Sequence, residues 1–284
     1  MSITLRAVNN DLNIAIAIVD ITDTLQENID LQSTNFLTST MLGKFICTSI
    51  LTNLNNKDSQ LETRFQLTTD GLLEQLSVDI YDNHYRGKVK NILLDPSSLD
   101  LKKDIYDQML GTEGQIAQYK IREGLILSES AIEISGSDID TNAMIFTKKS
   151  EQINNIIATT TIINEDNKVI RSCGIMIHML PGFTNENVTF LETKIGNTRY
   201  MKEVLAKTMN YNNLVEDIAP GSKILRVSDD LKYKCKCSYD KSLSFIELLQ
   251  PSDIQEIIDN KEEPEIVCEF CGKKYRISLS DINI

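Results

Sequence analysis

The sequence is poor in the residues on which many enzymes depend. It contains two histidines in 284 residues, so histidine-based acid–base or nucleophilic catalysis has little material. Its twelve glycines form no G-x-G-x-x-G or G-x-x-x-x-G-K pattern, which removes the usual signatures of phosphate binding. We therefore expect no enzymatic activity. His84 is predicted to lie in a surface loop, and His178 in the core or at a sheet edge.

Basic charge and long apolar runs are also scarce. The 29 Lys and Arg against 41 Asp and Glu give a net charge of −12, which argues against nucleic acid or an anionic membrane as partners, because both are bound through basic clusters. The longest early apolar run, Ile14 to Val19, has six residues and is too short to span a bilayer. The first residues do not resemble a signal peptide. We expect a soluble, cytoplasmic protein.

Cysteine is sparse and unevenly placed. Of six cysteines, four form two close pairs near the end of the chain, Cys235-Lys236-Cys237 and Cys268-Glu269-Phe270-Cys271. Such a chain is not a secreted disulfide scaffold, and paired cysteines in a reducing compartment more often serve metal or redox chemistry. Cys47 and Cys173 stand alone in apolar stretches, and we predict that they are buried as small hydrophobic side chains.

The paired cysteines have the ligand number and softness that tetrahedral zinc requires. Gly272, directly after the second pair, permits a tight turn that presents backbone N–H groups to sulfur. Lysines beside both pairs favour the thiolate over the thiol. We therefore predict one Zn²⁺ per chain, held by Cys235, Cys237, Cys268 and Cys271.

The spacing leaves the purpose of this zinc site open. Most four-cysteine zinc sites are permanent structural staples. The thiolates could instead be oxidised, since the separation within each pair fits the reach of a disulfide, for Cys235 and Cys237 with some strain. Residues 231–284 form a region of 54 residues, and a domain this small usually needs a staple. Loss of zinc should therefore unfold it.

Prolines indicate how the chain is divided. Pro181-Gly182 and Pro220-Gly221 mark two boundaries between regions of the chain, and Pro96 is the only proline before them. We predict an α+β protein with a mixed sheet-and-helix core domain over residues 1–180, a metastable helical linker over 181–230 and a small zinc-binding domain over 231–284. The linker should open early, because short amphipathic helices depend on packing against something else. An ordinary helical extension of the core is the alternative.

Hydrophobic periodicity predicts the individual elements. The predicted strands are 3–8, 12–21, 115–122, 125–132, 156–163 and 169–177; the predicted helices follow Ser33 and span 142–152, with hairpin turns at Asp70-Gly71 and Glu123-Gly124. In the linker, one face is predicted to carry Val188, Leu191 and Ile195 and another Met201, Leu205 and Met209. Ser252 and Gln255 have the spacing of a capping box.

The segments around the cysteine pairs resemble the 33-kilodalton heat shock protein family. They read Tyr233-Lys234-Cys235-Lys236-Cys237-Ser238, and later Cys268-Glu269-Phe270-Cys271-Gly272 with Tyr275 beyond. Weaker similarities run along essentially the whole chain: Leu42-Gly43, Asp70-Gly71, Arg86-Gly87-Lys88-Val89 and Ser150-Glu151-Gln152. The chain departs from the family pattern at Thr69, Leu72, Phe146, Asn154-Asn155 and Lys241, none of which replaces a sulfur.

The resemblance implies a redox-regulated, ATP-independent holdase chaperone. In such a protein the reduced, zinc-bound form is inactive, and oxidants form two neighbouring disulfides, release zinc and unfold the terminal domain and linker. The oxidised protein, often a homodimer, then binds unfolded client proteins. Carried over to this sequence, Cys235, Cys237, Cys268 and Cys271 are both zinc ligands and the cysteines of redox-active disulfides.

Two other functions compete with this interpretation. A structural zinc-ribbon adaptor without redox switching would retain its zinc, but residues 231–284 hold 8 Lys and Arg against 10 Asp and Glu, which disfavours nucleic acid as its partner. A thiol oxidoreductase would use Cys268 and Cys271, but the thioredoxin-like βαβ context is missing. Either function would predict a different response to oxidants.

Overall fold

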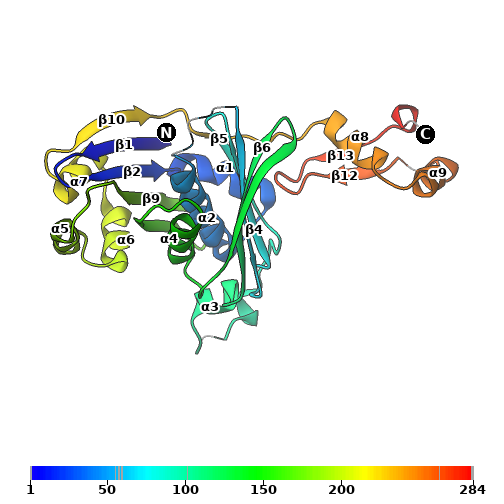
Figure 1. Ribbon diagram of the computed structural model, residues 1–284. Coiled ribbons are helices and arrows are strands. Elements are labelled where there is room, and N and C mark those ends of the chain that lie inside the picture. Colours follow the sequence, from blue (N-terminus) through cyan, green and yellow to red (C-terminus); the bar gives the residue numbers. More distant parts are fainter. Residues whose placement is uncertain are drawn as a thin grey trace. The chain divides into compact units, whose positions relative to one another are not determined.

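The protein is described here from a computed structural model that covers residues 2–54, 56, 58, 60–100, 102–261 and 263–282. The chain divides into two compact units, Met1–Tyr233 and Lys234–Ile284. Strands and helices are mixed in both units (Figure 1), which confirms the predicted α+β class. The prediction that 181–230 is a metastable linker concerns how the chain unfolds, and it stays a prediction.

A five-stranded antiparallel sheet with the order β10-β1-β2-β9-β8 forms one half of the first unit. Alternating apolar side chains on β1 and a nearly continuous apolar run on β2 bury both strands. The strands are β1 (Ile3–Asn9), β2 (Ile14–Asp20), β8 (Asn155–Ile163), β9 (Val169–Met179) and β10 (Lys223–Ser228). The first strand of the unit therefore lies beside a strand from near its end, because β1 pairs with β10.

A six-stranded sheet with the order β11-β5-β4-β3-β6-β7 forms the other half. Its strands are antiparallel except for β11, which runs parallel to β5. The strands are β3 (Glu62–Thr69), β4 (Gln75–Tyr81), β5 (His84–Val89), β6 (Gly114–Arg122), β7 (Leu125–Glu133) and β11 (Lys232–Tyr233). Glu123 and Gly124 both have positive φ, at 50° and 83°, as a two-residue hairpin turn requires, so the turn predicted there is confirmed.

Helix α2 (Phe36–Asn53) contacts strands of both sheets and is buried along most of its length. Asn35 caps its N-terminus by accepting a hydrogen bond from the Thr38 N–H at 3.2 Å. A Cβ atom at Gly43 would lie 2.7 Å from side-chain carbons of Leu25 and Thr161, so only glycine fits at this point. The first unit also contains the helices α1 (Thr22–Gln32), α3 (Ile105–Leu110), α4 (Ile139–Ser150) and the short η1 (Pro96–Ser98).

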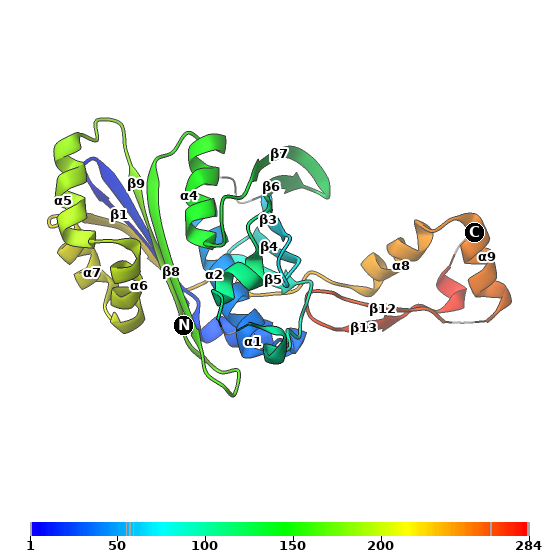
Figure 2. The ribbon, with the colours of Figure 1, turned by 90° about the horizontal axis from the view of Figure 1, so that it is seen from below.

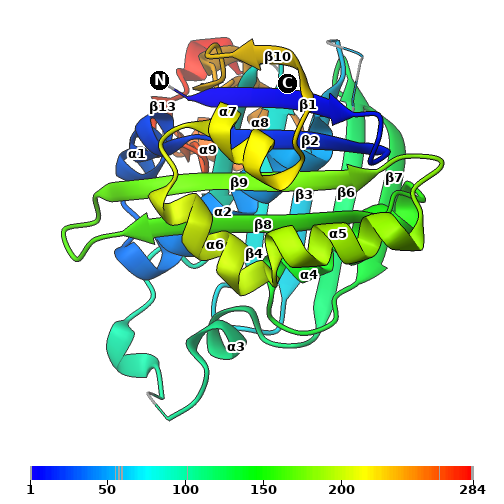
Figure 3. The same ribbon diagram turned by 90° about the vertical axis from the view of Figure 1, so that its left-hand side faces the viewer.

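Three helices cover the opposite face of the five-stranded sheet (Figure 3). They are α5 (Asn185–Ile195), α6 (Thr198–Lys207) and α7 (Tyr211–Ile218), all from the region predicted to be a linker. Leu191, Leu205 and Val215 pack in one apolar cluster with side chains of the sheet such as Ile16 and Ile175. This cluster is the principal attachment of the three helices.

The second unit is built from α8 (Tyr239–Glu247), α9 (Pro251–Asp259), the hairpin β12 (Glu265–Val267) and β13 (Lys274–Arg276), and η2 (Leu279–Asp281). Its core is small, with five buried apolar side chains that pack together: Ile246, Ile254, Tyr275, Ile277 and Ile282. A core of this size contributes little stability by itself. We therefore expect the unit to need a cross-link between its loops to stay folded.

Several local predictions were wrong. Met209 lies beyond the end of α6 and is 87% exposed, so it does not share a helix face with Met201 and Leu205 as predicted. Val188, Leu191 and Ile195 do share a face of α5. Helix α9 starts at Pro251 with Gln250 as its N-cap and no side-chain hydrogen bond, so the predicted capping box does not form. His84 is the first residue of β5 instead of a loop residue.

Candidate metal centre

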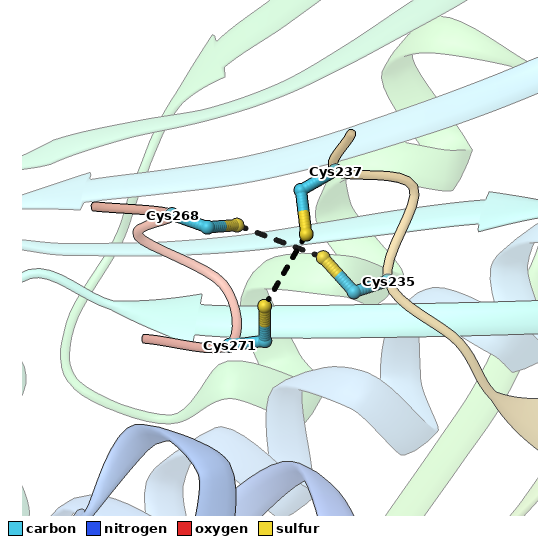
Figure 4. Close-up of side chains that lie close together, drawn as sticks. All are labelled: Cys235, Cys237, Cys268 and Cys271. Carbon is cyan, nitrogen blue, oxygen red and sulfur yellow. Dashed lines mark hydrogen bonds between the residues drawn. The ribbon is translucent and has the colours of Figure 1, made fainter. Parts of the chain in front are cut away.

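The four paired cysteines converge from two loops of the second unit (Figure 4). Cys235 and Cys237 precede α8, whereas Cys268 and Cys271 lie in the turn between β12 and β13. All four Sγ atoms lie within 4.8 Å of one another. Two close separations cross between the loops, at 3.6 Å for Cys235 and Cys268 and 3.5 Å for Cys237 and Cys271.

The second loop owes its shape to the hairpin that carries it. The Cys268 N–H donates to the Lys273 carbonyl at 2.9 Å, and the Gly272 N–H donates to the Cys268 carbonyl at 2.8 Å. Gly272 adopts a φ of 68°, a conformation that glycine reaches without a steric penalty. This tight turn aims both sulfurs in one direction and brings the backbone N–H groups of Phe270 and Cys271 toward the Cys268 sulfur.

The first loop is fixed by the start of α8. The Ser238 Oγ accepts a hydrogen bond from the Lys241 N–H at 3.2 Å and so caps the helix directly after Cys237. The Lys241 Nζ donates to the Lys236 carbonyl at 3.0 Å, which ties the residue between the two cysteines back to the helix. Both loops therefore place their sulfurs by local hydrogen bonds.

One hydroxyl group contacts the sulfur cluster. The Tyr275 hydroxyl donates to the Cys237 Sγ at 3.2 Å, which connects β13 to the opposite loop. Sequence reasoning singled out Tyr275 only as an aromatic of the family pattern and missed this contact. Its position four residues after Cys271, on the second strand of the hairpin, was the available signal.

Burial raises the pKa of the Cys268 and Cys271 thiols, and the neighbouring sulfurs raise it further. Backbone N–H groups act in the opposite direction, that of Lys273 on Cys271 included. Four crowded thiols resist becoming thiolates together unless a cation compensates their charge. The flanking lysines give limited compensation, because Lys274 pairs with Glu265 at 2.7 Å.

The arrangement fits a metal ion. A tetrahedral zinc site with Zn–S bonds of about 2.3 Å places its sulfurs roughly 3.8 Å apart, and the closest sulfur pairs lie at 3.5 and 3.6 Å. Four sulfur donors on two short loops can therefore hold a metal ion with little movement. In the parts of the chain that the structure describes, no second group of three or more His, Cys, Asp or Glu side chains converges in this way.

The other singled-out residues lie elsewhere. Cys47 and Cys173 are buried as predicted; the Cys47 sulfur lies 3.5 Å from the Ser172 hydroxyl. His178 lies within β9, where burial lowers its pKa. His84 Nδ1 is 2.6 Å from the Asp82 carbonyl oxygen. Neither histidine is near the sulfur cluster in the sequence or belongs to another cluster of ligands among the described residues.

Comparisons with known proteins agree along the whole chain. The family model described as "Hsp33 protein" matches residues 3–278. The 33 kDa chaperonin of Latilactobacillus sakei is 22% identical over 98% of this chain and 96% of its own length, and that of Streptococcus pyogenes is 23% identical over 93% and 91%. The crystal structure of the 33 kDa chaperonin (heat shock protein 33 homolog) of Thermotoga maritima has the same fold, with a TM-score of 0.84, 17% identity and coverage of 99% of this chain and 96% of that one.

A search of the described helices for membrane-spanning segments gave none with the required length and apolar character.

Proposed function

The chain belongs to the Hsp33 chaperone family, and from that premise we propose that it is a redox-regulated, ATP-independent holdase. The observation that carries the proposal is the convergence of Cys235, Cys237, Cys268 and Cys271 in a unit with a very small core. A site that holds such a unit together makes its fold depend on the oxidation state of four sulfurs.

In the reduced state, we propose that the four cysteines hold one Zn²⁺. The ion would compensate the thiolate charges and join the two loops, which is worth on the order of 10 kcal/mol in small zinc-dependent domains. The chain's own contribution is the positioning of the sulfurs by Gly272, by the Ser238 cap and by the Tyr275 hydroxyl. The protein is inactive in this state because the apolar face of the five-stranded sheet is covered by α5 to α7.

Oxidation by a peroxide would break the cross-link. Two thiolates that form one disulfide lose two electrons, and one hydrogen peroxide takes up these electrons and two protons from water as its O–O bond breaks to give two waters. Two peroxides thus convert the four cysteines into two disulfides, proposed as Cys235–Cys237 and Cys268–Cys271. Since all four sulfurs lie within 4.8 Å, their positions do not select this pairing over the other two. Disulfide sulfurs no longer bind zinc.

Unfolding of the second unit would then loosen the helices α5 to α7. These helices are short, and they are attached to the five-stranded sheet mainly by one apolar cluster. Their release would uncover apolar side chains of the sheet, among them Leu5, Ile16 and Ile175. A continuous apolar face of this kind binds the exposed apolar segments of unfolding client proteins.

The proposal also covers the type of activity, the cellular compartment and the oligomeric state. The protein acts as a binding protein and not as an enzyme, it works in the reducing cytoplasm, and the oxidised form is a homodimer. Apolar surface uncovered by oxidation is also a surface through which two copies can associate. Sedimentation of the reduced and oxidised forms checks this part directly.

The test is light scattering from a heat-unfolded client protein. Peroxide-treated protein should suppress aggregation at a stoichiometric ratio without ATP, whereas reduced, zinc-loaded protein should not. The matched control is the variant Cys47→Ala/Cys173→Ala, which retains the four clustered cysteines and should still be activated. Equal suppression by the reduced and oxidised proteins would contradict the switch and favour a structural zinc module.

A further inference from the structure

The β7 strand leaves an apolar edge uncovered. It is the last strand of the six-stranded sheet and pairs only with β6 (Figure 2). Three consecutive aliphatic side chains at its start are largely exposed: Leu125 by 70%, Ile126 by 61% and Leu127 by 54%. Contiguous exposed aliphatic residues on a sheet edge are uncommon, because such an edge is a template for pairing with another chain.

The backbone of β7 has unused hydrogen-bonding capacity. Residues 125–133 form the ladder with β6, and none of the other backbone hydrogen bonds found among the described residues involves them. In an antiparallel strand, alternate N–H and C=O groups point away from the paired neighbour. The outer edge of β7 therefore offers a row of donors and acceptors beside an apolar surface, which only an extended segment can satisfy fully.

Two registers of pairing with a second copy oppose like charges. Antiparallel self-pairing centred on Glu129 would set that residue opposite its own copy, and pairing centred on Ala131 would set it opposite Glu133. Like charges directly opposite each other destabilise a strand pair, whereas a partner strand with a cation at these positions does not meet this cost.

The charges on the strand indicate which segments do fit. Glu129 and Glu133 follow the three aliphatic residues on an edge otherwise made of small polar or apolar side chains. A partner strand with apolar residues opposite 125–127 and Lys or Arg opposite the glutamates would satisfy both features. We propose that the β7 edge docks extended segments of unfolded proteins in which apolar residues accompany Lys or Arg, by adding them to the six-stranded sheet.

This inference rests on the proposed holdase function for the source of such segments, but it adds a site that is open in the reduced state. Residues 125–133 belong to the first unit, and their exposure does not require release of α5 to α7. A single strand edge gives weak binding, because an ordered partner loses conformational entropy along its whole length. Oxidation would then supply a second surface, and the two together would bind more tightly than either alone.

The experiment uses reduced full-length protein and a fluorescein-labelled ten-residue peptide with lysines in its N-terminal half and valines in its C-terminal half, followed by fluorescence anisotropy. Binding should weaken about tenfold in Leu125→Ser/Leu127→Ser, because two aliphatic contacts are lost. Leu93→Ser, which removes an equally exposed leucine outside any strand, should bind as the wild type does. A peptide N-methylated at alternate residues should lose binding, since it cannot pair with a strand edge.

A charge-reversed variant and a charge-reversed peptide test the preference for Lys or Arg. Glu129→Lys/Glu133→Lys should bind a valine–glutamate peptide better than the valine–lysine peptide, the reverse of the wild type. Equal binding of the methylated peptide, or equal binding by the double serine variant, would overturn the proposal. The proposal would also be overturned if the reduced wild type sediments as a dimer and the double serine variant as a monomer. The edge would then bind a second copy of the chain.

The two proposals fail differently. If oxidised wild type suppresses client aggregation and the double serine variant does so equally while the peptide binds both alike, the edge is not a client site and the holdase function stands. If peptide binding follows the edge substitutions but the oxidised wild type never suppresses aggregation, the edge stands and the holdase function does not.

Discussion

The Tyr275 hydroxyl donates a hydrogen bond to the Cys237 Sγ of the sulfur cluster. Hydrogen bonds to metal ligands orient them, and their loss typically lowers metal affinity by roughly ten- to a hundredfold. We expect Tyr275→Phe to weaken zinc binding by at least about tenfold in competition with a chelator. Lys274→Gln changes the adjacent exposed residue of β13 and should retain full affinity. Unchanged affinity in Tyr275→Phe would show that the hydroxyl does not act on Cys237.

Asp79 provides a test of pH dependence in the first unit. Burial alone would raise the pKa of its carboxyl group, but Arg64 at 2.6 Å and Arg86 at 2.7 Å outweigh burial and hold the pKa below its ordinary value. A carboxyl group with a lowered folded-state pKa stabilises the fold above its unfolded-state pKa of about 3.9, and this stabilisation is lost as the pH falls through the lower, folded-state value.

We therefore expect Asp79→Asn to lower the free energy of unfolding by about 3 kcal/mol at pH 7, because it leaves two arginines beside a neutral group. The difference from the wild type should shrink below about pH 4. Urea unfolding between pH 3 and pH 7 measures both values. Asp166→Asn, at an exposed carboxyl group in the turn between β8 and β9, should follow the wild type throughout. A difference that stays constant with pH would contradict this assignment.

At the scale of elements, a buried ion pair attaches α6 to the core. The Asp140 carboxylate is 1% exposed; it accepts hydrogen bonds from the Thr159 N–H at 3.0 Å and hydroxyl at 2.6 Å. The Lys202 Nζ, on α6, lies 2.9 Å from Asp140, whereas the Lys44 Nζ lies 3.8 Å away. Lys202 thus supplies the closer of the two cations and links α6 to α4 and β8.

Substitution of Lys202 should make α6 open more readily. Lys202→Met leaves the buried carboxylate with the more distant lysine, and we expect amide hydrogen exchange in α6 to become at least about tenfold faster in the reduced protein. Arg199→Gln removes an exposed pair with Glu203 on the same helix, worth a few tenths of a kcal/mol, and should change little. Equal exchange rates in both variants would exclude the ion pair as an attachment of the linker.

Elements with a strong apolar pattern were predictable, and those without one were not. The apolar runs of β2, α2 and β9 were recognised because their side chains enter the core. Strand β10 was missed because Lys223–Ser228 is exposed along nearly its whole length, and its position follows only from pairing with β1. Met209 was misassigned because a helical face was extended past the end of α6.

In the candidate site, too, some features were predictable from the sequence and others were not. Cysteine spacing was enough to group the four sulfurs, since each short loop brings its own pair together. The contact between Tyr275 and Cys237 depends on how the β12–β13 hairpin faces the other loop, and no local pattern encodes that. The exposed edge of β7 was equally hidden, because Leu125–Glu133 was correctly predicted as a strand without any indication of its place in the sheet.

In the whole molecule, we propose that four sulfurs control the fold of the second unit, whose core is small. The second unit continues the chain directly from β11, so its unfolding would change the segment that follows α5 to α7 and β10. In the proposed switch, the chemistry of one site is converted into exposure of apolar surface elsewhere in the chain. This conversion requires zinc, thiols and helix content to change together.

The most direct measurement is a peroxide titration of the reduced, zinc-loaded protein in which zinc release, free thiols and circular dichroism are read on the same samples. The account predicts that one zinc and four thiols per chain are lost in parallel with helix, while the two remaining thiols of the six, Cys47 and Cys173, stay reduced because they are buried. Zinc retained with all six thiols titratable after denaturation, or four thiols lost with no change in helix, would contradict it.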